Sequence, residues 1–350
     1  MKNNTSILII YTGGTIGMIT NPETGSYTPV DFERLQEKVP VIKSFGYKIE
    51  TISFDPPVDS SNLKPETWIN LSNILIENYT KYDGFVILHG TDTMSYTASA
   101  LSFMLQNFSK PVILTGSQLP IETIRTDGKE NLITAIEIAA MKRKGQAVVP
   151  EVCIYFENKL YRGNRTTKRN AEYFDAFESP NYPSLAKAGI EIRFNYKRIR
   201  YPDYNKIPSV KNKLDTNIAI LKMYPGISKN TVNAILNIKG LKGLILETFG
   251  SGNTMTDEWF VKLLKEAIEK GLIILNITQC IAGSVIQGKY ETSVKLKKIG
   301  VIGGSDMTTE AAVTKLMYLL GHKLHRKDVE IYLKQSIAGE LSENLSDNKI

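Results

Sequence analysis

Two threonine-containing turns near the start of the chain carry the side chains best suited to chemistry. Residues 12–15 read Thr-Gly-Gly-Thr, and residues 89–93 read His-Gly-Thr-Asp-Thr. A threonine hydroxyl becomes a nucleophile when a neighbouring base removes its proton. Glycine accepts φ > 0 and lets another backbone or a ligand approach closely. Together, the two turns can present hydroxyls, a carboxylate and backbone N–H groups to a small molecule.

Taken alone, the first turn has three interpretations. A strand-to-loop connection without chemistry is favoured for an isolated Gly-Gly pair by about two to one. A phosphate cradle is the second, although the sequence lacks the Lys-Ser/Thr of a P-loop and the three-glycine dinucleotide spacing. A threonine nucleophile on a constrained loop is the third. In the second turn, Asp92 and Thr93 alone are typical of a helix cap, and His89 of a packed structural residue.

Both turns follow apolar runs that predict buried strands, at 7–10 and 85–88, and a third run at 112–114 leads into Thr-Gly-Ser-Gln. Further strand patterns and helix patterns complete the N-terminal half: strands at 49–53 and 152–156, and helices at 68–79, 97–105 and 131–142. This alternation predicts a parallel sheet with helices on both faces. Such sheets bind ligands at the carboxyl ends of their strands, so we expect the turns to lie together.

A second α/β unit is predicted after a basic stretch that contains tyrosine and proline. Its strands are expected at 217–221, 243–246 and 272–277, and its helices at 258–270, 310–320 and 329–336. We therefore predict an α/β protein of two domains. The larger N-terminal domain, with a mixed or parallel sheet, covers 1–194, a linker covers 195–213, and a smaller Rossmann-like domain covers 214–350.

The composition and net charge of the chain favour some classes of protein over others. The chain has 350 residues and a net charge of +7, but acids and bases interleave, which indicates solubility rather than nucleic-acid binding. No apolar run is long enough to span a membrane or to resemble a signal peptide, so we expect a cytoplasmic protein. Cys153 and Cys280 are predicted to be reduced core residues. The three histidines show no metal-ligand spacing, so we expect no metal.

Three further segments have two interpretations each. Residues 21–29 predict a loop that can act as a lid carrying Tyr27 into the site, or that leaves Tyr27 on the surface. The polar run at 59–62 can cap the following helix or line a pocket. The basic cluster at 159–169 is typical of a solvated face, but its arginines can also be fixed by hydrogen bonds, with one lysine against a carboxylate.

With these segments identified, the sequence resembles the bacterial L-asparaginase family. Residues 11–18 and 89–94 are similar to its two signature motifs, in order and spacing, and residues 160–168 and 302–308 resemble its cytoplasmic, type I branch. The similarity covers essentially the whole chain. It implies an amidohydrolase that converts L-asparagine to L-aspartate and ammonia, with no cofactor and no nucleic-acid or membrane partner. It also implies homodimers, commonly paired into homotetramers.

The resemblance also implies roles for individual residues. Thr15 matches the nucleophile, Thr91 the second catalytic threonine, Asp92 its neighbour and Lys168 the lysine that works with them, while Tyr27 occupies the place of the lid tyrosine. The expected substrate-binding residues are Gly14, Asp59, Ser60, Ser61, Gly90, Thr91, Asp92, Ser117 and Asn253. In the family, the counterpart of Asn253 reaches the site of a neighbouring subunit. The implied intermediate is a β-aspartyl ester on Thr15, although which threonine attacks first stays open.

Two departures from the family pattern leave alternatives open. Some cytoplasmic members bind asparagine at a second, activating site through an arginine, and here that position holds Glu247, although Thr167 and Cys280 are kept. The acidic residue that secreted members supply across the dimer has no clear counterpart near 288–291, so glutamine turnover stays open. The alternatives are a glutaminase-asparaginase, an amidotransferase subunit, which typically carries an added N-terminal domain, or a silent amino-acid sensor. The intact catalytic set argues against the sensor.

Overall fold

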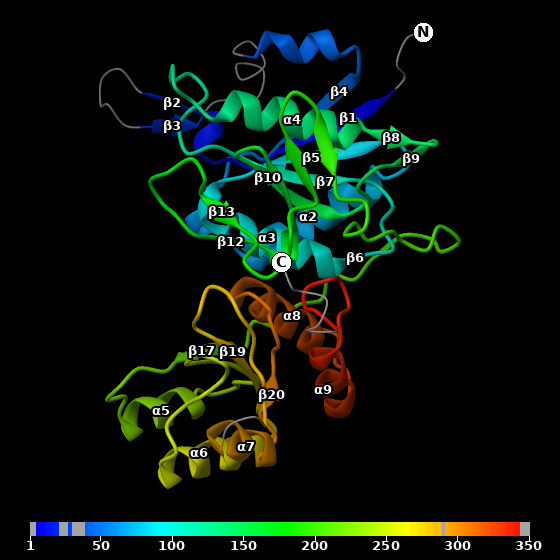
Figure 1. Cartoon of the computed structure of the whole chain (residues 1–350). Helices are drawn as coiled ribbons and strands as arrows, with labels where there is room; N and C mark the ends of the chain where they lie inside the picture. The colour runs from blue at the N-terminus through cyan, green and yellow to red at the C-terminus, as the bar shows by residue number, and fades with distance from the viewer. Residues whose placement is uncertain (1–4, 21–26, 30–38, 289–290, 344–350) are drawn as a thin grey trace. The chain divides into compact units, whose positions relative to one another are not determined.

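The computed structural model describes residues 5–20, 27–29, 39–288 and 291–343. The chain separates into two compact units (Figure 1). The first comprises Met1–Ser179 and Pro183–Asn212, and the second comprises Pro180–Tyr182 and Lys213–Ile350. Most of the segment expected to be a linker thus belongs to the first unit. There, β16 (Ser209–Val210) pairs with β6 (Leu105–Gln106).

The first unit is built on a sheet of eight strands within the described residues, in the order β15-β14-β11-β10-β7-β5-β1-β4. Their bounds are β1 Ser6–Tyr11, β4 Lys48–Ser53, β5 Gly84–Leu88, β7 Val112–Thr115, β10 Val152–Phe156, β11 Lys159–Arg162, β14 Ala186–Ala188 and β15 Ile192–Phe194. Strands β4, β1, β5, β7 and β10 run parallel, and β11, β14 and β15 continue the sheet antiparallel. The expected mixed sheet is therefore confirmed.

Helices cover both faces of this sheet, as predicted. Helices α2 (Pro65–Glu77) and α3 (Met94–Met104) lie on one face and α4 (Gly128–Ala140) on the other (Figure 1). Successive residues of a strand point to opposite faces. Leu8 and Ile10 of β1 accordingly join the core beneath α2 and α3. The central strands read as unbroken apolar runs because both faces of a parallel sheet are buried.

The remaining elements of the first unit are short. They are the 3-10 turns η1 Thr15–Gly17, η2 Pro40–Phe45, η3 Ser60–Asn62, η4 Thr91–Thr93 and η5 Gly163–Arg165, and the strands β2 Met18–Thr20, β3 Tyr27–Pro29, β8 Lys142–Arg143, β9 Gln146–Ala147, β12 Thr167–Lys168 and β13 Phe177–Glu178. The prediction of a loop over all of 21–29 was wrong at its end. Strand β3 pairs antiparallel with β2, so a two-stranded ribbon follows the first turn. Residues 21–26 lie outside the described residues.

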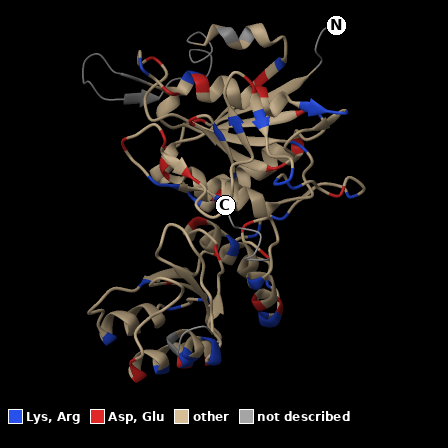
Figure 2. Cartoon of the chain, viewed as in Figure 1, with Lys and Arg blue, Asp and Glu red and all other residues tan. Residues whose placement is uncertain are grey.

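The second unit carries a four-stranded parallel sheet within its described part, in the order β17-β18-β19-β20. Its elements are β17 Ile218–Lys222, β18 Gly243–Thr248, β19 Ile273–Thr278, β20 Ile302–Gly303, α5 Lys229–Leu236, α6 Glu258–Glu269, α7 Glu291–Lys298, α8 Thr309–Gly321 and α9 Arg326–Lys334. Phe260 and Leu264 of α6 pack into its core. The predicted second α/β domain is confirmed, and acidic and basic residues intersperse along both units (Figure 2).

The two cysteines differ in environment. Cys153 lies fully buried in β10, as predicted, whereas Cys280 is exposed, so its assignment to the core was wrong. The reason is local. Strand β19 ends at Thr278, whose hydroxyl accepts a hydrogen bond from the Cys280 backbone N–H at 3.0 Å, so the chain has already turned out of the sheet. Across the described ranges, no helix is both long and apolar enough to cross a bilayer.

Candidate active site

The first turn begins where β1 ends, and its two threonines have different surroundings. Thr12 is buried, and its backbone N–H and its Oγ1 both donate to the Leu88 carbonyl, at 3.0 and 2.9 Å. Its own carbonyl accepts from the Val58 N–H at 2.7 Å. Thr12 therefore fastens the ends of β1 and β5. Thr15, three residues later, opens η1 and is partly exposed.

Glycines let the first two turns touch. Gly14 has φ 93°, and a Cβ added to it would lie 2.4 Å from the Gly90 nitrogen, which is closer than real side chains approach. A Cβ on Gly90 would in turn meet Ser60 Oγ at 2.4 Å. Only glycine allows this packing. Thr15 and Thr91 each follow directly after one of the two contacting glycines, so the fold brings their backbones together.

Lys168 joins the second turn from a distant part of the chain. Its Nζ donates to Thr91 Oγ1 at 2.8 Å and to Asp92 Oδ1 at 2.7 Å. The Lys168 side chain is 17% exposed, whereas that of Asp92 is 62% exposed. The hydroxyl, the ammonium and the carboxylate form one hydrogen-bonded group. Because the carboxylate is open to solvent, it can also receive a positively charged ligand.

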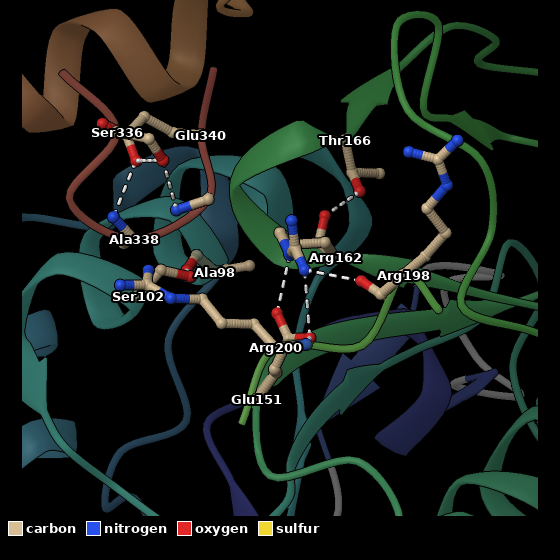
Figure 3. Close-up of polar contacts among 11 residues, drawn as sticks. Ala98, Ser102, Glu151, Arg162, Thr166, Arg198, Arg200, Ser336, Ala338 and Glu340 are labelled. Carbon is tan, nitrogen blue, oxygen red and sulfur yellow. Dashed lines mark hydrogen bonds and ion pairs between the residues drawn. The ribbon is translucent and has the colours of Figure 1, made fainter. Parts of the chain in front are cut away.

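Buried contacts hold the segment that delivers Lys168. Arg162 forms a bidentate ion pair with Glu151, with Nε–Oε2 at 2.6 Å and Nη2–Oε1 at 3.1 Å, and both side chains are almost fully buried (Figure 3). Arg162 Nη2 also donates to the Arg198 carbonyl at 2.8 Å. Thr166 Oγ1 donates to the Arg162 carbonyl at 2.7 Å and closes the turn before Lys168. The second interpretation of this basic cluster, arginines fixed by hydrogen bonds, is the correct one for Arg162.

His89 lies behind the second turn and is buried, as expected for a structural residue. Its Nδ1 faces the Gly90 carbonyl at 2.7 Å, and its Nε2 faces Thr97 Oγ1 at 2.8 Å. Trp68 Nε1 donates to the same Thr97 hydroxyl at 3.0 Å. A carbonyl can only accept, so Nδ1 carries the proton and Nε2 accepts from Thr97. Burial lowers the pKa of His89 to about 4, so the ring is neutral at pH 7.

The polar run at 59–61 packs beside the second turn. Asp59 Oδ1 accepts from the Ser61 N–H at 3.0 Å and so caps the short turn η3, rather than the following helix α2. Ser60 is buried, and its carbonyl accepts from Thr93 Oγ1 at 2.8 Å. The fold thus brings Ser60 to the Thr91 turn, with Asp59 and Ser61 exposed on either side.

The third strand-end turn carries two residues of interest that lie outside the two signature motifs. Ser117, an expected binding residue, is buried, and its Oγ donates to the Leu119 carbonyl at 2.5 Å. Gln118 contacts Thr91 directly, with Thr91 Oγ1 to Gln118 Oε1 at 3.2 Å. Asp127 accepts from the Gln118 N–H at 3.0 Å. Burial raises the pKa of Asp127, although the N–H groups it accepts from oppose that shift. The one signal for Gln118 in the sequence was that it belongs to the polar turn that follows a third predicted strand.

Two further expected site residues belong to other segments of the chain. The backbone of Tyr27 pairs with Thr20 across β2 and β3, and its side chain lies outside what the structure describes. Asn253 belongs to the second unit, where it closes a turn through two backbone hydrogen bonds with Phe249, each of 2.8 Å. Among the residues described, no three His, Cys, Asp or Glu side chains gather in a way that could hold a metal ion.

Comparison with known proteins gives consistent matches over almost the whole chain. Residues 6–200 match the model of the asparaginase N-terminal domain, and residues 217–333 match the glutaminase/asparaginase C-terminal domain. L-asparaginase 1 of Escherichia coli is 43% identical over 348 residues, which covers 96% of this chain and 98% of that protein. The crystal structure of L-asparaginase I from Vibrio cholerae is 40% identical, with a TM-score of 0.87 over 97% of this chain and 99% of that one. The L-asparaginase of Thermococcus kodakarensis is 33% identical, with a TM-score of 0.88 over 97% of this chain and 100% of that one.

Proposed function

The chain belongs to the asparaginase family, and from this premise we propose that it hydrolyses L-asparagine to L-aspartate and ammonia. The observation that carries the proposal is the position of Lys168 Nζ, 2.8 Å from Thr91 Oγ1 and 2.7 Å from Asp92 Oδ1, beside the Gly14–Gly90 contact. This places a hydroxyl, a proton carrier and a carboxylate within one hydrogen-bonded group. An amide hydrolysis of a charged amino acid needs each of them.

In the proposed reaction, the Thr15 hydroxyl attacks the side-chain carboxamide carbon of asparagine. Its proton passes to a base, and the carbonyl oxygen becomes a tetrahedral oxyanion. Backbone N–H groups of the glycine-bounded turns can donate to that oxyanion, and one such donor can contribute about 3 kcal/mol. The C–N bond then breaks, ammonia leaves with a proton, and a β-aspartyl ester remains on Thr15. Water hydrolyses the ester and restores the Thr15 hydroxyl.

The second turn supports this chemistry. Lys168 and Thr91 form a path along which a proton can move to or from the reacting groups. Asp92 binds the α-ammonium of the substrate, which its exposure permits, while it also holds Lys168. Ser60 packs against Gly90 and accepts from Thr93 Oγ1, which supports a role for Asp59, Ser60 and Ser61 in binding a polar, zwitterionic substrate.

Purified protein is expected to release ammonia from millimolar L-asparagine with no added metal or nucleotide, and with EDTA present. The reason is that the proposed steps use only side chains and backbone groups of the two turns. Coupled ammonia detection, with folding checked by circular dichroism, tests this. Folded protein that releases no ammonia would rule the proposed function out.

The same assay separates the alternatives. A glutaminase-asparaginase releases ammonia from glutamine at a comparable kcat/KM. An amidotransferase subunit acts on asparagine poorly and depends on an aminoacyl-tRNA partner. A sensor binds asparagine, measurable by calorimetry, without turnover. We propose asparagine as the preferred substrate and the cytoplasm as the compartment, on the strength of the type I relatives.

We also propose a homodimer, or a tetramer made of two dimers, in which Asn253 completes the site of a neighbouring subunit. The support is the resemblance of its turn, which two backbone hydrogen bonds with Phe249 hold rigid. Sedimentation should therefore show a dimer or larger at the concentrations at which the enzyme works. Asn253→Ala should lower kcat/KM without dissociating it. A monomer with full activity at nanomolar concentration would contradict both statements.

Glu247 argues against activation by free asparagine. By the family resemblance it occupies the position at which activated members have an arginine. Its buried carboxylate accepts from Thr309 Oγ1 at 2.8 Å and pairs with Lys222 at 3.5 Å. Lys242, a neighbouring basic residue that could take over the contact of that arginine, pairs with Asp215 instead, which supports the proposal. An effector carboxylate would lose two charge-assisted hydrogen bonds and meet a like charge.

Rates should therefore depend on asparagine concentration almost hyperbolically. A missing effector site removes a coupling free energy of typically about 1–3 kcal/mol between two sites. Steady-state rates over three decades of asparagine concentration give the Hill coefficient. A value well above one would show that an activating site is present despite Glu247.

A further inference from the structure

Tyr11, the last residue of β1, folds back onto the short turn η1 that begins at Thr15. Its side chain is 1% exposed, and its hydroxyl donates to the Gly17 carbonyl at 3.1 Å. The hydrogen bond therefore ties the end of the strand to the last residue of the turn. Burial raises the pKa of Tyr11 to about 12, so the hydroxyl keeps its proton at pH 7 and serves as a donor rather than a base.

The contact between Tyr11 and Gly17 leaves no room for a side chain at position 17. A Cβ added to Gly17 would lie 2.1 Å from the Tyr11 hydroxyl oxygen and 2.3 Å from ring carbon Cζ, distances that real Cβ atoms essentially never show. Gly13 and Gly14 have a positive φ, whereas Gly17 does not. Gly17 is therefore required for the close approach of the ring, not for its own backbone conformation.

The rest of the turn is fixed as well. The Gly17 N–H donates to the Gly14 carbonyl at 3.1 Å. Ile16 is fully buried, and a Cβ added to Gly128 would lie 3.3 Å from its Cγ1. Among the three residues of η1, only Thr15 is partly exposed. Because the turn is so short, a displacement of Gly17 moves Thr15 with it.

We propose that Tyr11 is a positioning residue for Thr15: its hydroxyl holds the Gly17 carbonyl, and through it the turn that presents the nucleophile. The inference rests on the proposed function, in which the Thr15 hydroxyl attacks the substrate. Removal of the Tyr11 hydroxyl takes a donor away from a buried carbonyl, which is costly. The last peptide of the turn then rotates toward another donor, and Thr15 leaves the position from which it attacks.

The test is Tyr11→Phe, which keeps the ring and removes only the hydroxyl. We expect kcat/KM for asparagine to fall about tenfold or more, because misplacing a reacting group by about 1 Å has effects of this size. The affinity for L-aspartate, measured by calorimetry, should stay within about twofold, since Asp92 and residues 59–61 are unchanged. The pH profile of kcat/KM should keep its shape, because the variant removes no titrating base.

Two variants complete the design. Gly17→Ala keeps the Tyr11 hydroxyl but displaces the ring from the turn, so it should lower kcat/KM at least as much as Tyr11→Phe. Tyr82→Phe is the matched control and should leave kcat/KM within about twofold of the wild type. Tyr82 is also a buried tyrosine of the first unit, it donates to Glu50, and it precedes the amino end of β5, whereas Tyr11 lies at the carboxyl end of β1.

Three kinetic or binding results overturn the inference. They are a kcat/KM of Tyr11→Phe equal to that of the control, a loss of affinity for L-aspartate that accounts for the whole effect, and a changed pH profile. The last of these would assign Tyr11 a role in proton transfer instead.

Crystal structures of the wild type and Tyr11→Phe provide a readout that does not depend on turnover. We expect the Thr15 Cα to move by more than about 0.5 Å relative to Gly90, which exceeds the tolerance of a catalytic constellation. An unmoved Thr15 overturns the inference. Failure of the proposed function has a different signature: the wild type then releases no ammonia, and the position of Thr15 still decides whether Tyr11 holds the turn.

Discussion

Replacing Thr15 with alanine is expected to abolish asparagine turnover, lowering kcat by at least about a hundredfold. No other hydroxyl of the first turn can substitute for it. Thr12 Oγ1 is buried and donates to the Leu88 carbonyl at 2.9 Å, on the side of the turn that fastens β1 to β5. Steady-state kinetics at saturating asparagine measure the loss, and an unchanged melting temperature shows that the fold is intact.

Two further variants test the interpretation of that result. Thr15→Ser keeps the hydroxyl and should retain measurable turnover, which separates loss of the nucleophile from loss of packing. Thr91→Val keeps the shape of the side chain but removes the acceptor of Lys168, and should be as damaging as Thr15→Ala because groups that act as a unit do not replace one another. Activity above about a tenth of the wild type in either Thr15→Ala or Thr91→Val would be incompatible with the assigned roles.

Lys315→Met should destabilise the second unit by about 3–5 kcal/mol. Lys315 of α8 and Glu340 form an ion pair of 2.5 Å in which both side chains are fully buried. The Glu340 carboxylate also accepts from the Ile337 N–H at 3.1 Å and from the Ala338 N–H at 2.8 Å. Figure 3 shows the contact with Ala338. Removing the lysine leaves a buried charge without its counter-ion. The midpoint of urea unfolding should fall at an unchanged slope.

The double variant Lys315→Met/Glu340→Gln is the matched control. It removes both charges and keeps an acceptor for the backbone N–H groups, so it should recover most of the lost stability. A double variant as unstable as Lys315→Met would show that packing, not charge, explains the loss. The pair also predicts a pH dependence. Burial alone would raise the pKa of Glu340, but Lys315 and the N–H groups outweigh it and hold the pKa below its usual 4.5.

The sign of that pH dependence follows from the lowered pKa. A carboxyl whose folded-state pKa is depressed stabilises the fold above its unfolded pKa, and that stability is lost as the pH falls through the folded-state value. The contribution of Glu340 to the unfolding free energy of the wild type, measured by urea unfolding, should therefore be full at pH 7 and decrease as the pH falls below about 4.5.

The sequence by itself determined the alternation of strands and helices and the two strand-end turns. Apolar runs such as 7–10 and 85–88 are buried on both faces of the sheet, and that burial dictates both their composition and their position. The glycines of the first turn could also be recognised as structurally required, because the φ of 93° at Gly14 suits few other residues. The family resemblance then selected Thr15 and Thr91, among many threonines, as the proposed catalytic residues.

Only the tertiary structure decided which of these groups meet. Lys168 and Asp92 are 76 residues apart in the chain, and no local pattern encodes their contact. The same holds for Gln118, whose only local signal was its place after a strand, and for Cys280, which lies past the end of β19 rather than in it. The pattern of apolar residues along a strand arises from burial, so it can be recognised within a short stretch of sequence. Hydrogen bonds between distant turns depend on how the sheet aligns its strand ends, and so they exist only once the whole unit has folded.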